Sequence, residues 1–454
     1  MSSDSKNFKK PKPSHSRLLA YDLITEVNRS GAFANIRLPQ LLSESTLELR
    51  DRAFATELSY GTLRMQGKYD FAISSKIDRP IAELDVKIVD LLRMGCHQIF
   101  EMRVPTHAAV SETVEVARFV AGESKASYVN ALLRAISSDS GIFDVLEDES
   151  KYDFVTKLSI QYSHPEWIIN SYHDVLKSWD SVIELLAVNN VAAHPHLVAW
   201  PGKSTREELL AVGGEALEFT RFGIESNTQP TDYPAIRQRN AGVQDFGSQL
   251  VSEIFFDTNK EDPAQSWLDL CAGPGGKSAF LFNSLMAKDA TLSFTANEPT
   301  PHRAELVARV IPRQFISTFD GRNPELFAQT YDRVLIDAPC TGLGALRRRP
   351  EARWRKSLTD LKELVPLQRD LIDSAIQMTN PGGIVGYSTC SPHMAETLAQ
   401  VLDTLHRNKN VSLLNVSDFH DLPPESVNAN GTMQLWTHKH NSDAMFLALF
   451  RKSA

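Results

Sequence analysis

The second half of the chain, from about residue 248, alternates short apolar runs with segments of helical period. Apolar runs at 267–270, 292–296 and 334–336 are each followed by a turn, and further runs follow toward the end of the chain. This alternation predicts a mostly parallel sheet with helices on both faces, because parallel strands need long crossover connections. Such crossovers bring the carboxyl ends of the strands to one edge, so polar residues that follow different strands are expected to meet there.

Candidate functional residues follow five of these predicted strands. A glycine-rich turn comes after the first strand, acidic residues follow the second and third, and a cysteine follows each of the next two. These residues are the turn Cys271, Ala272, Gly273, Pro274, Gly275, Gly276 and Lys277, then Glu298, Asp320, Asp337 with Cys340, and Cys390. The arrangement predicts a single site in which two thiols lie beside a nucleoside-binding pocket.

The glycine-rich turn fits neither common phosphate-binding motif. A P-loop needs a glycine where Cys271 stands, and the dinucleotide fingerprint needs a third glycine where Ser278 stands. A P-loop ATPase is therefore a poor alternative. A tight turn without a strong demand for phosphate suits S-adenosylmethionine, for which Glu298 would hold the ribose hydroxyls and Asp320 would accept from the adenine amino group.

The two thiols point to covalent chemistry on a pyrimidine. Carbon 5 of cytosine is a poor nucleophile, and a thiolate that adds to carbon 6 makes it reactive enough to accept a methyl group. A second thiol would assist release, and Asp337 would hydrogen-bond the base. A helix expected from Pro392 would lower the pKa of the Cys390 thiol. These arguments leave open which of Cys340 and Cys390 attacks.

The remaining sequence divides into three further segments. Residues 1–14 are polar and basic and are predicted to be disordered. Residues 15–149 repeat apolar residues at spacings of three and four, which predicts an all-helical domain. Residues 150–247 indicate a helical connector and a small α+β module, and residues 248–454 form the predicted α/β domain.

Composition restricts the partners and the compartment. None of the four cysteines forms a C-x-x-C pair, so no metal is expected, and Cys96 is interpreted as a buried apolar residue. The net charge is −8, but residues 346–356 carry six cations around Trp354, which we interpret as contacts to a nucleic-acid strand. Without an apolar run long enough for a membrane span, or a secretory signal, a cytoplasmic protein with no membrane partner is expected.

Specific motifs carry a resemblance to a known family. The C-terminal half resembles the RNA cytosine-5 methyltransferases, and the chain from about residue 15 onward is similar to the bacterial RsmB (Sun/Fmu) family, which acts on small-subunit (16S) ribosomal RNA. The helical domain is similar to NusB, an RNA-binding antitermination factor. The residues that carry these likenesses are Asp269–Ser278, Asp320–Arg322, Leu335–Cys340, Arg348–Pro350 with Trp354, Tyr387–Cys390, Pro105–Glu112 and Val129–Arg134.

The resemblance implies a fold, a cofactor and a role for each site residue. It implies a NusB-like all-α N-terminal domain, a small α+β linker module that contacts RNA, and a Rossmann-like S-adenosylmethionine-dependent methyltransferase domain. Cys390 would be the nucleophile and Cys340 would aid product release. The turn 271–277 with Glu298, Asp320 and Asp337 would line the cofactor site. Ribosomal RNA of the small subunit would be the partner of a monomeric enzyme.

The chain departs from the family pattern at three places. Gly273 stands where the family often has alanine, Glu298 replaces a commoner aspartate, and Ala444-Met445-Phe446 replaces a frequent Gly-Phe-Phe. Three alternative functions stay open. They are a NusB-like RNA-binding or ribosome assembly factor without catalysis, a cytosine-5 methyltransferase of another RNA such as tRNA, and a DNA cytosine methyltransferase in which Cys340 attacks.

Overall fold

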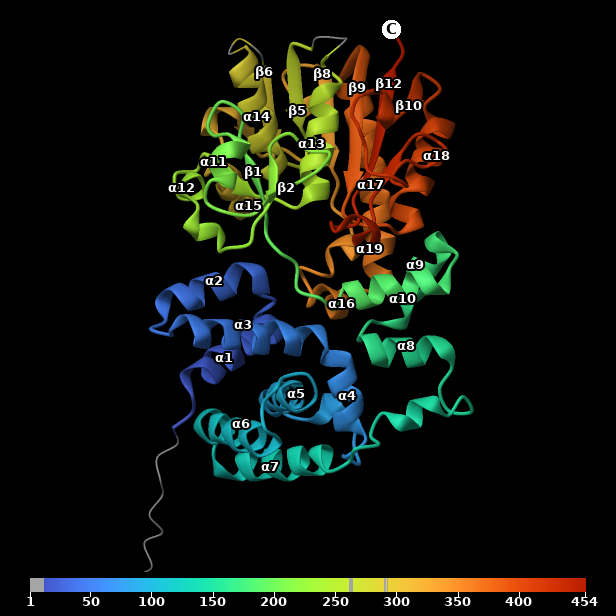
Figure 1. Cartoon of the computed structure of the whole chain (residues 1–454). Coiled ribbons are helices and arrows are strands. Elements are labelled where there is room, and N and C mark those ends of the chain that lie inside the picture. Colours follow the sequence, from blue (N-terminus) through green and yellow to red (C-terminus); the bar gives the residue numbers. More distant parts are fainter. Residues whose placement is uncertain (1–11, 261–263, 290, 292) are drawn as a thin grey trace, which may run out of the picture. The chain divides into compact units, whose positions relative to one another are not determined.

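The computed structural model describes residues 12–260, 264–289, 291 and 293–454, which fall into two compact units (Figure 1). The first unit holds the chain up to Asn170 together with Arg348–Arg355, and the second holds Ser171–Arg347 and Lys356–Ala454. Most of the predicted disordered tail, residues 1–11, lies outside the described residues, and the predicted domain boundaries stay predictions. Within the described stretches, no helix has both the length and the apolar character needed to cross a membrane.

The first unit is built from helices around α5 (Val86–Phe100), which Figure 1 shows nearly end-on. Helix α5 contacts α1, α3, α4, α6 and α7, and Cys96 on it is fully buried, as the sequence predicts. The all-α character of the N-terminal domain is thereby confirmed. The other helices are α1 (His15–Ser30), α2 (Ala34–Glu44), α3 (Leu49–Arg64), α4 (Gln66–Ser74), α6 (Thr106–Ala121), α7 (Glu123–Ser137), α8 (Phe154–Tyr162) and α16 (Ala352–Arg355), with α9 (Glu166–Leu176) beginning here.

Two arginines of the basic run at 346–356 do not have the role that the sequence indicates. Arg353 is fully buried and donates to the backbone oxygens of Arg64 and Ser163. Arg355 donates to the carbonyls of Val27, Gly31 and Ala32 near the end of α1. Helix ends leave carbonyl groups without partners, and these guanidinium groups satisfy them. The interpretation as contacts to nucleic acid is therefore wrong for both side chains.

A small four-stranded antiparallel sheet forms the middle module of the second unit, with strand order β2-β3-β1-β4. Its central strand β1 pairs with β3 and β4, and Leu197, Leu209, Ile224 and Tyr233 form its core. This arrangement confirms the predicted α+β module. Its elements are β1 (His196–Ala199), β2 (Glu215–Ala216), β3 (Gly223–Glu225), β4 (Ala241–Val243), α11 (Arg206–Leu210) and α12 (Pro234–Arg237), preceded by α10 (Trp179–Val188).

The large sheet has eight strands in the order β10-β12-β9-β8-β5-β6-β7, with β11 paired to β12. The strands from β9 to β7 are parallel, while β12 pairs antiparallel with β9, β10 and β11 at one edge. This sheet confirms the predicted Rossmann-like domain. The strands are β5 (Ser266–Asp269), β6 (Ser293–Asn297), β7 (Ile316–Ser317), β8 (Tyr331–Asp337), β9 (Thr379–Thr389), β10 (Val411–Leu414), β11 (Met433–Gln434) and β12 (Phe446–Lys452).

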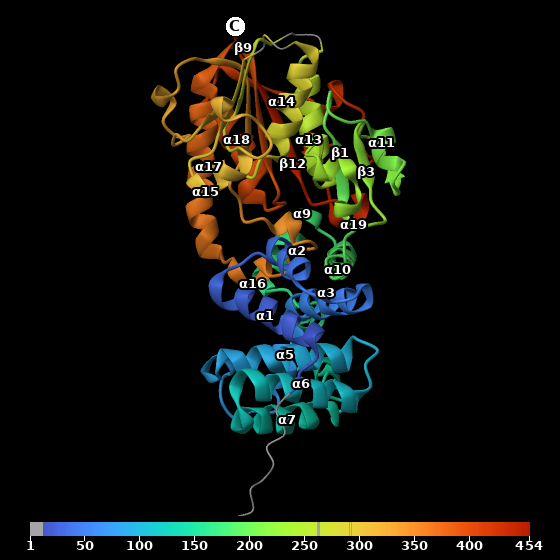
Figure 2. The ribbon, with the colours of Figure 1, turned by 90° about the vertical axis from the view of Figure 1, so that its left-hand side faces the viewer.

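Helices cover both faces of the large sheet (Figure 2). Along β8, Leu335 packs into one core with residues of α13 and α14, while Val334 and Ile336 pack into the other with α17. This alternation follows from the period of two along a strand, and burial on both faces explains why residues 334–336 of β8 are all apolar. The helices of this layer structure are α13 (Phe246–Asp257), α14 (Gly276–Lys288), α15 (Pro301–Val307), α17 (Leu358–Met378), α18 (Leu398–Arg407) and α19 (Thr437–His440).

A charged cluster joins the small module to the large sheet within the second unit. Arg221 pairs with the buried carboxylates of Glu253 and Asp257 on α13. His420 contacts Asp257 through Nδ1 at 2.8 Å and the Phe219 carbonyl through Nε2 at 2.9 Å. Both partners are acceptors, so both ring nitrogens donate and the ring is an imidazolium.

This cluster makes stability depend on pH. Burial alone would lower the pKa of His420, but the hydrogen bonds to Asp257 and Phe219 and the nearby carboxylates outweigh it, so the pKa is raised above 6.5. A raised pKa in the folded state stabilises the fold below the unfolded value of about 6.5. We expect this stabilisation to be lost as pH rises through the folded pKa. Urea unfolding between pH 5.5 and 8.5 should show this loss in the wild type and not in His420→Gln. A difference between the two proteins that does not change with pH would contradict the assignment.

Candidate active site

Several of the predicted site residues lie where three adjacent parallel strands end. Strand β5 ends at Asp269, β8 at Asp337 and β9 at Thr389, and Asp337 lies opposite Ser388 in the sheet. From β5 the chain moves outward to β6 and β7 and then returns to place β8 on the other side of β5. A change of direction of this kind opens a crevice at the carboxyl edge of a parallel sheet.

The side chains of the two cysteines of the site are in contact at this edge of the sheet. Cys340 Sγ and Cys390 Sγ are 3.4 Å apart, and both residues are partly exposed. The hydrogen bond with Cys390, burial and the charge of Glu396 hold the pKa of the Cys340 thiol well above its usual range. A thiol whose pKa is raised in this way stays protonated at neutral pH.

The helix expected from Pro392 is absent from this part of the described chain. After Cys390 the backbone forms a short 3-10 turn at Met394–Glu396, and α18 begins only at Leu398. The favourable field of a helix falls off within its first turn. The predicted lowering of the Cys390 pKa by a helix starting at Pro392 is therefore wrong.

Asp337 is held by two polar side chains at the end of β8. Lys277 Nζ lies 2.7 Å from Oδ2, and Ser388 Oγ donates to Oδ1 at 3.1 Å. Lys277, which the sequence places with the cofactor turn, is almost fully buried, while the Asp337 side chain keeps 29% of its surface exposed. The carboxylate is thus fixed in orientation and still accessible to a ligand at the edge of the sheet.

The glycine turn packs closely against Glu298. Gly275 has a φ of +113°, which favours glycine. The Gly273 N–H donates to Glu298 Oε2 at 3.1 Å, and Glu298 Oε1 accepts from Thr300 N. Arg303 donates to the Gly273 carbonyl at 2.5 Å. Strand β6 therefore orients the turn through a buried carboxylate.

Two of the family departures noted in the sequence explain each other. A Cβ on Gly273 would lie 2.3 Å from Glu298 Oε2, which is far inside van der Waals contact. The longer side chain of glutamate brings its oxygen to the place where an alanine methyl group would stand. The chain therefore combines glutamate at 298 with glycine at 273.

Two further residues of the site were given no role from the sequence. Asp269 accepts from Ser278 Oγ at 2.5 Å, while its Oδ1 is buried with no hydrogen-bond partner in the described part of the protein. Burial raises the pKa of Asp269 to about 7. Asn297 donates to the carbonyls of Leu270 and Phe319 and so ties the loop after β5 to the loop after β7. Asp269 lies inside a predicted strand and Asn297 directly follows one, where the sequence gives no sign of a polar partner.

Asp320 follows β7, as predicted, and forms an ion pair with Arg322, whose Nε lies 3.0 Å from Oδ1. About 40% of its side chain is exposed. The positive φ at Gly275, the unpartnered buried oxygen of Asp269 and the exposed carboxylates of Asp320 and Asp337 fit a nucleoside-type ligand lying along this edge. The residues present are thus compatible with S-adenosylmethionine.

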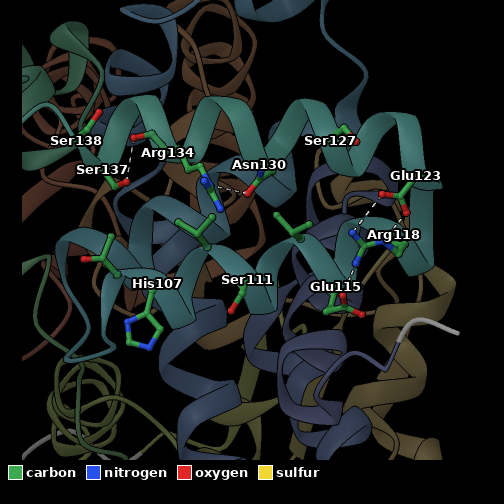
Figure 3. A pocket seen from close by; sticks show the side chains of 13 residues that line it. His107, Ser111, Glu115, Arg118, Glu123, Ser127, Asn130, Arg134, Ser137 and Ser138 are labelled. Carbon is green, nitrogen blue, oxygen red and sulfur yellow. Dashed lines mark hydrogen bonds and ion pairs between the residues drawn. The ribbon is translucent and has the colours of Figure 1, made fainter. Parts of the chain in front are cut away.

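A separate groove of about 1040 Å³ lies between α6 and α7 in the first unit (Figure 3). Arg118 there pairs with Glu115 and Glu123, and Arg134 contacts Asn130. These internal pairs neutralise the cationic charge of Arg118. The groove contains none of the predicted site residues.

Fold and site together define a methyltransferase of the Rossmann-like class joined to a helical unit. The model of a family described as 16S rRNA methyltransferase RsmB/F matches residues 257–451, and that of the NusB family matches residues 14–138. The putative methyltransferase Rv1407 of Mycobacterium tuberculosis is 40% identical over 444 residues, which cover 96% of each chain. The ribosomal RNA small subunit methyltransferase B of Vibrio vulnificus is 26% identical over 96% of this chain and 99% of its own.

The chain belongs to the RsmB/F family of methyltransferases, with a NusB-type N-terminal domain. The resemblance found in the sequence is thereby confirmed, and so is S-adenosylmethionine as the cofactor. Among solved structures, the crystal structure of PH0851 has a TM-score of 0.80 at 21% identity and covers 98% of this chain and 100% of its own. That likeness supports the fold.

The pairing of Gly273 with Glu298 predicts a compensating double substitution. Gly273→Ala should weaken S-adenosylmethionine binding about 5- to 160-fold, since overpacking of a buried site costs about 1–3 kcal/mol. Glu298→Asp shortens the carboxylate, so Gly273→Ala with Glu298→Asp should bind the cofactor more tightly than Gly273→Ala alone. Isothermal titration calorimetry of the four proteins measures this. Equal binding by the double variant and Gly273→Ala would show that the two positions are independent.

Proposed function

We propose that this protein transfers a methyl group from S-adenosylmethionine to carbon 5 of a cytosine in small-subunit (16S) ribosomal RNA. The observation that carries the proposal is the 3.4 Å separation of the Cys340 and Cys390 sulfurs at the carboxyl edge of the sheet. Asp337, fixed by Lys277, lies at the end of the strand that precedes Cys340. Relatives named for small-subunit ribosomal RNA support this choice of substrate.

In the proposed reaction Cys390 is the nucleophile. Its thiolate adds to carbon 6 of the cytosine, and the electron pair that moves to carbon 5 forms the new bond to the methyl group. S-adenosylmethionine supplies that methyl group when bound. Loss of the proton from carbon 5 then allows the Cys390 sulfur to leave and restores the aromatic ring. The raised pKa of Cys340 supports this assignment, because a thiol that stays protonated is a poor nucleophile.

The other site residues have roles that follow from their places. Asp337 accepts a hydrogen bond from the base and holds carbon 6 near the attacking sulfur, and Lys277 keeps its carboxylate in position. Cys340, as the proton-bearing thiol, assists release of the product. We infer that residues 271–277, Glu298, Asp320 and Asp337 bind the cofactor. The middle module at 150–247 is proposed to contact RNA.

The alternatives are less well supported by the site. A binding or assembly factor without catalysis has no need of two facing thiols beside a cofactor turn. Attack by Cys340, as in DNA cytosine methylation, is disfavoured by the raised pKa of that thiol. Methylation of another RNA, such as tRNA, would use the same chemistry, so substrate mapping must separate it from the proposed function.

Cys390→Ala should lower methyl transfer to small-subunit RNA by at least about a thousandfold, because loss of a covalent nucleophile removes most of the rate enhancement. Cys340→Ala should instead leave enzyme attached to RNA as a complex that survives denaturing electrophoresis. Radioactive S-adenosylmethionine and mapping of 5-methylcytosine measure the first effect. Cys96→Ala, which removes a thiol in the core of the first unit, is the matched control. Normal methylation by Cys390→Ala would refute the assignment of the nucleophile.

A further inference from the structure

A buried glutamate connects the two cysteine loops of the site. Glu396 lies on the 3-10 turn after Cys390 and is fully buried. Its carboxylate accepts from Thr341 N at 2.8 Å, from Thr341 Oγ1 at 2.5 Å and from Gln368 Nε2 at 3.0 Å. Burying a carboxylate costs free energy unless it is fully hydrogen-bonded. The three hydrogen bonds that Glu396 accepts offset this cost.

The donors to Glu396 come from both sides of Cys340. Thr341 follows the cysteine directly, and Gln368 also donates to the carbonyl of Pro339, which precedes it, at 2.8 Å. The backbone on either side of Cys340 is therefore fixed through the same carboxylate. Charge-assisted hydrogen bonds of this kind are about twice as strong as neutral ones.

The same network reaches the residue after Cys390. The Thr341 and Ser391 hydroxyl oxygens are 3.1 Å apart. Because the Thr341 hydroxyl donates to Glu396, it must accept from Ser391. The Gly344 N–H also donates to the Cys390 carbonyl at 2.9 Å, so the two loops are joined at a second point beyond the thiols.

We propose that Glu396 is a positioning residue that holds Cys340 and Cys390 at their short separation. The thiols follow different strands, and the hydrogen bonds of the sheet end before either cysteine is reached. The Thr341 hydroxyl lies on the Cys340 loop and is hydrogen-bonded to both Glu396 and Ser391, which follow Cys390. The negative charge of Glu396 also contributes to the raised pKa of Cys340, which favours a protonated thiol beside the attacking one. The inference rests on the proposed two-thiol mechanism.

The first test measures thiol separation without RNA. Diamide, an azo oxidant, takes the two thiol hydrogens and becomes a hydrazine while an S–S bond forms between neighbouring cysteines. Thr341→Val removes only the bridging hydroxyl, and we expect it to slow formation of the Cys340–Cys390 disulfide at least about fivefold, since a lost hydrogen bond of about 1 kcal/mol has this effect. Peptide mass spectrometry under non-reducing conditions gives the rate.

Thr404→Val is the matched control for this substitution. Thr404 on α18 is also fully buried, but within the described residues its hydroxyl has no hydrogen-bond partner. The same chemical change there should leave the disulfide rate at the wild-type value. If Thr341→Val oxidises as fast as Thr404→Val and the wild type, the positioning role is refuted.

The second test uses the methyl transfer reaction. Glu396→Gln keeps the shape of the side chain but removes its charge and one acceptor. We expect kcat to fall about 10- to 100-fold while the Kd for S-adenosylmethionine stays within about twofold, because Glu396 contacts the cysteine loops and not the glycine turn. An equal loss of cofactor affinity, or an unchanged kcat, would contradict the inference. If this variant does not fold, Thr341→Val provides the same kinetic comparison.

The two proposals fail in different ways. If wild-type protein transfers no methyl group to cytosine, the proposed function is wrong, whatever the disulfide rates are. If the wild type methylates RNA and Thr341→Val has an unchanged disulfide rate and kcat, the proposed function stands and the positioning role of Glu396 is wrong.

Discussion

The pairing of β8 with β9 is the constraint on which the site depends. These two strands run parallel over their carboxyl halves, and their register places Asp337 opposite Ser388. Beyond this last pair, Cys340 follows Asp337 by three residues and Cys390 follows Ser388 by two residues. The 3.4 Å contact between sulfurs that are 50 residues apart in sequence is a consequence of that register. A slip of one residue would turn every side chain of β9 to the opposite face and separate the thiols.

The sequence could predict most of this arrangement because it depends on local patterns. The apolar run of β8 and the polar residues directly after it suffice to place Asp337 and Cys340 at the edge of a parallel sheet. The glycine turn is similarly local, since Gly275 has a positive φ that few other residues adopt. Features of this kind are encoded within a few residues, so the fold class and the thiol pair could both be inferred.

Other features could not be predicted because they depend on partners far away in the sequence. Arg353 belongs to a basic run that indicates an exposed surface, yet its guanidinium is buried against carbonyls of Arg64 and Ser163. Composition cannot distinguish a cation that binds phosphate from one that binds the carbonyl groups at a helix end, because both groups present electron-rich oxygens. Glu396 was missed for the same reason. A single acid after a turn gives no sign of the donors on Thr341 and Gln368 that will surround it.

The two buried glutamates of the site, Glu298 and Glu396, each fix a loop that lies beyond the end of a strand. Parallel strands fix the backbone only as far as their last hydrogen bond, and chemistry takes place in the loops beyond. Glu298 fixes the glycine turn by accepting from the Gly273 backbone, and the lack of a Cβ there leaves room for its oxygen. Glu396 fixes the cysteine loops by accepting from Thr341 and Gln368. In both cases the carboxylate of one loop accepts a hydrogen bond from a backbone N–H group of another loop, at Gly273 or at Thr341. These bonds extend the rigidity of the sheet to the atoms that must react.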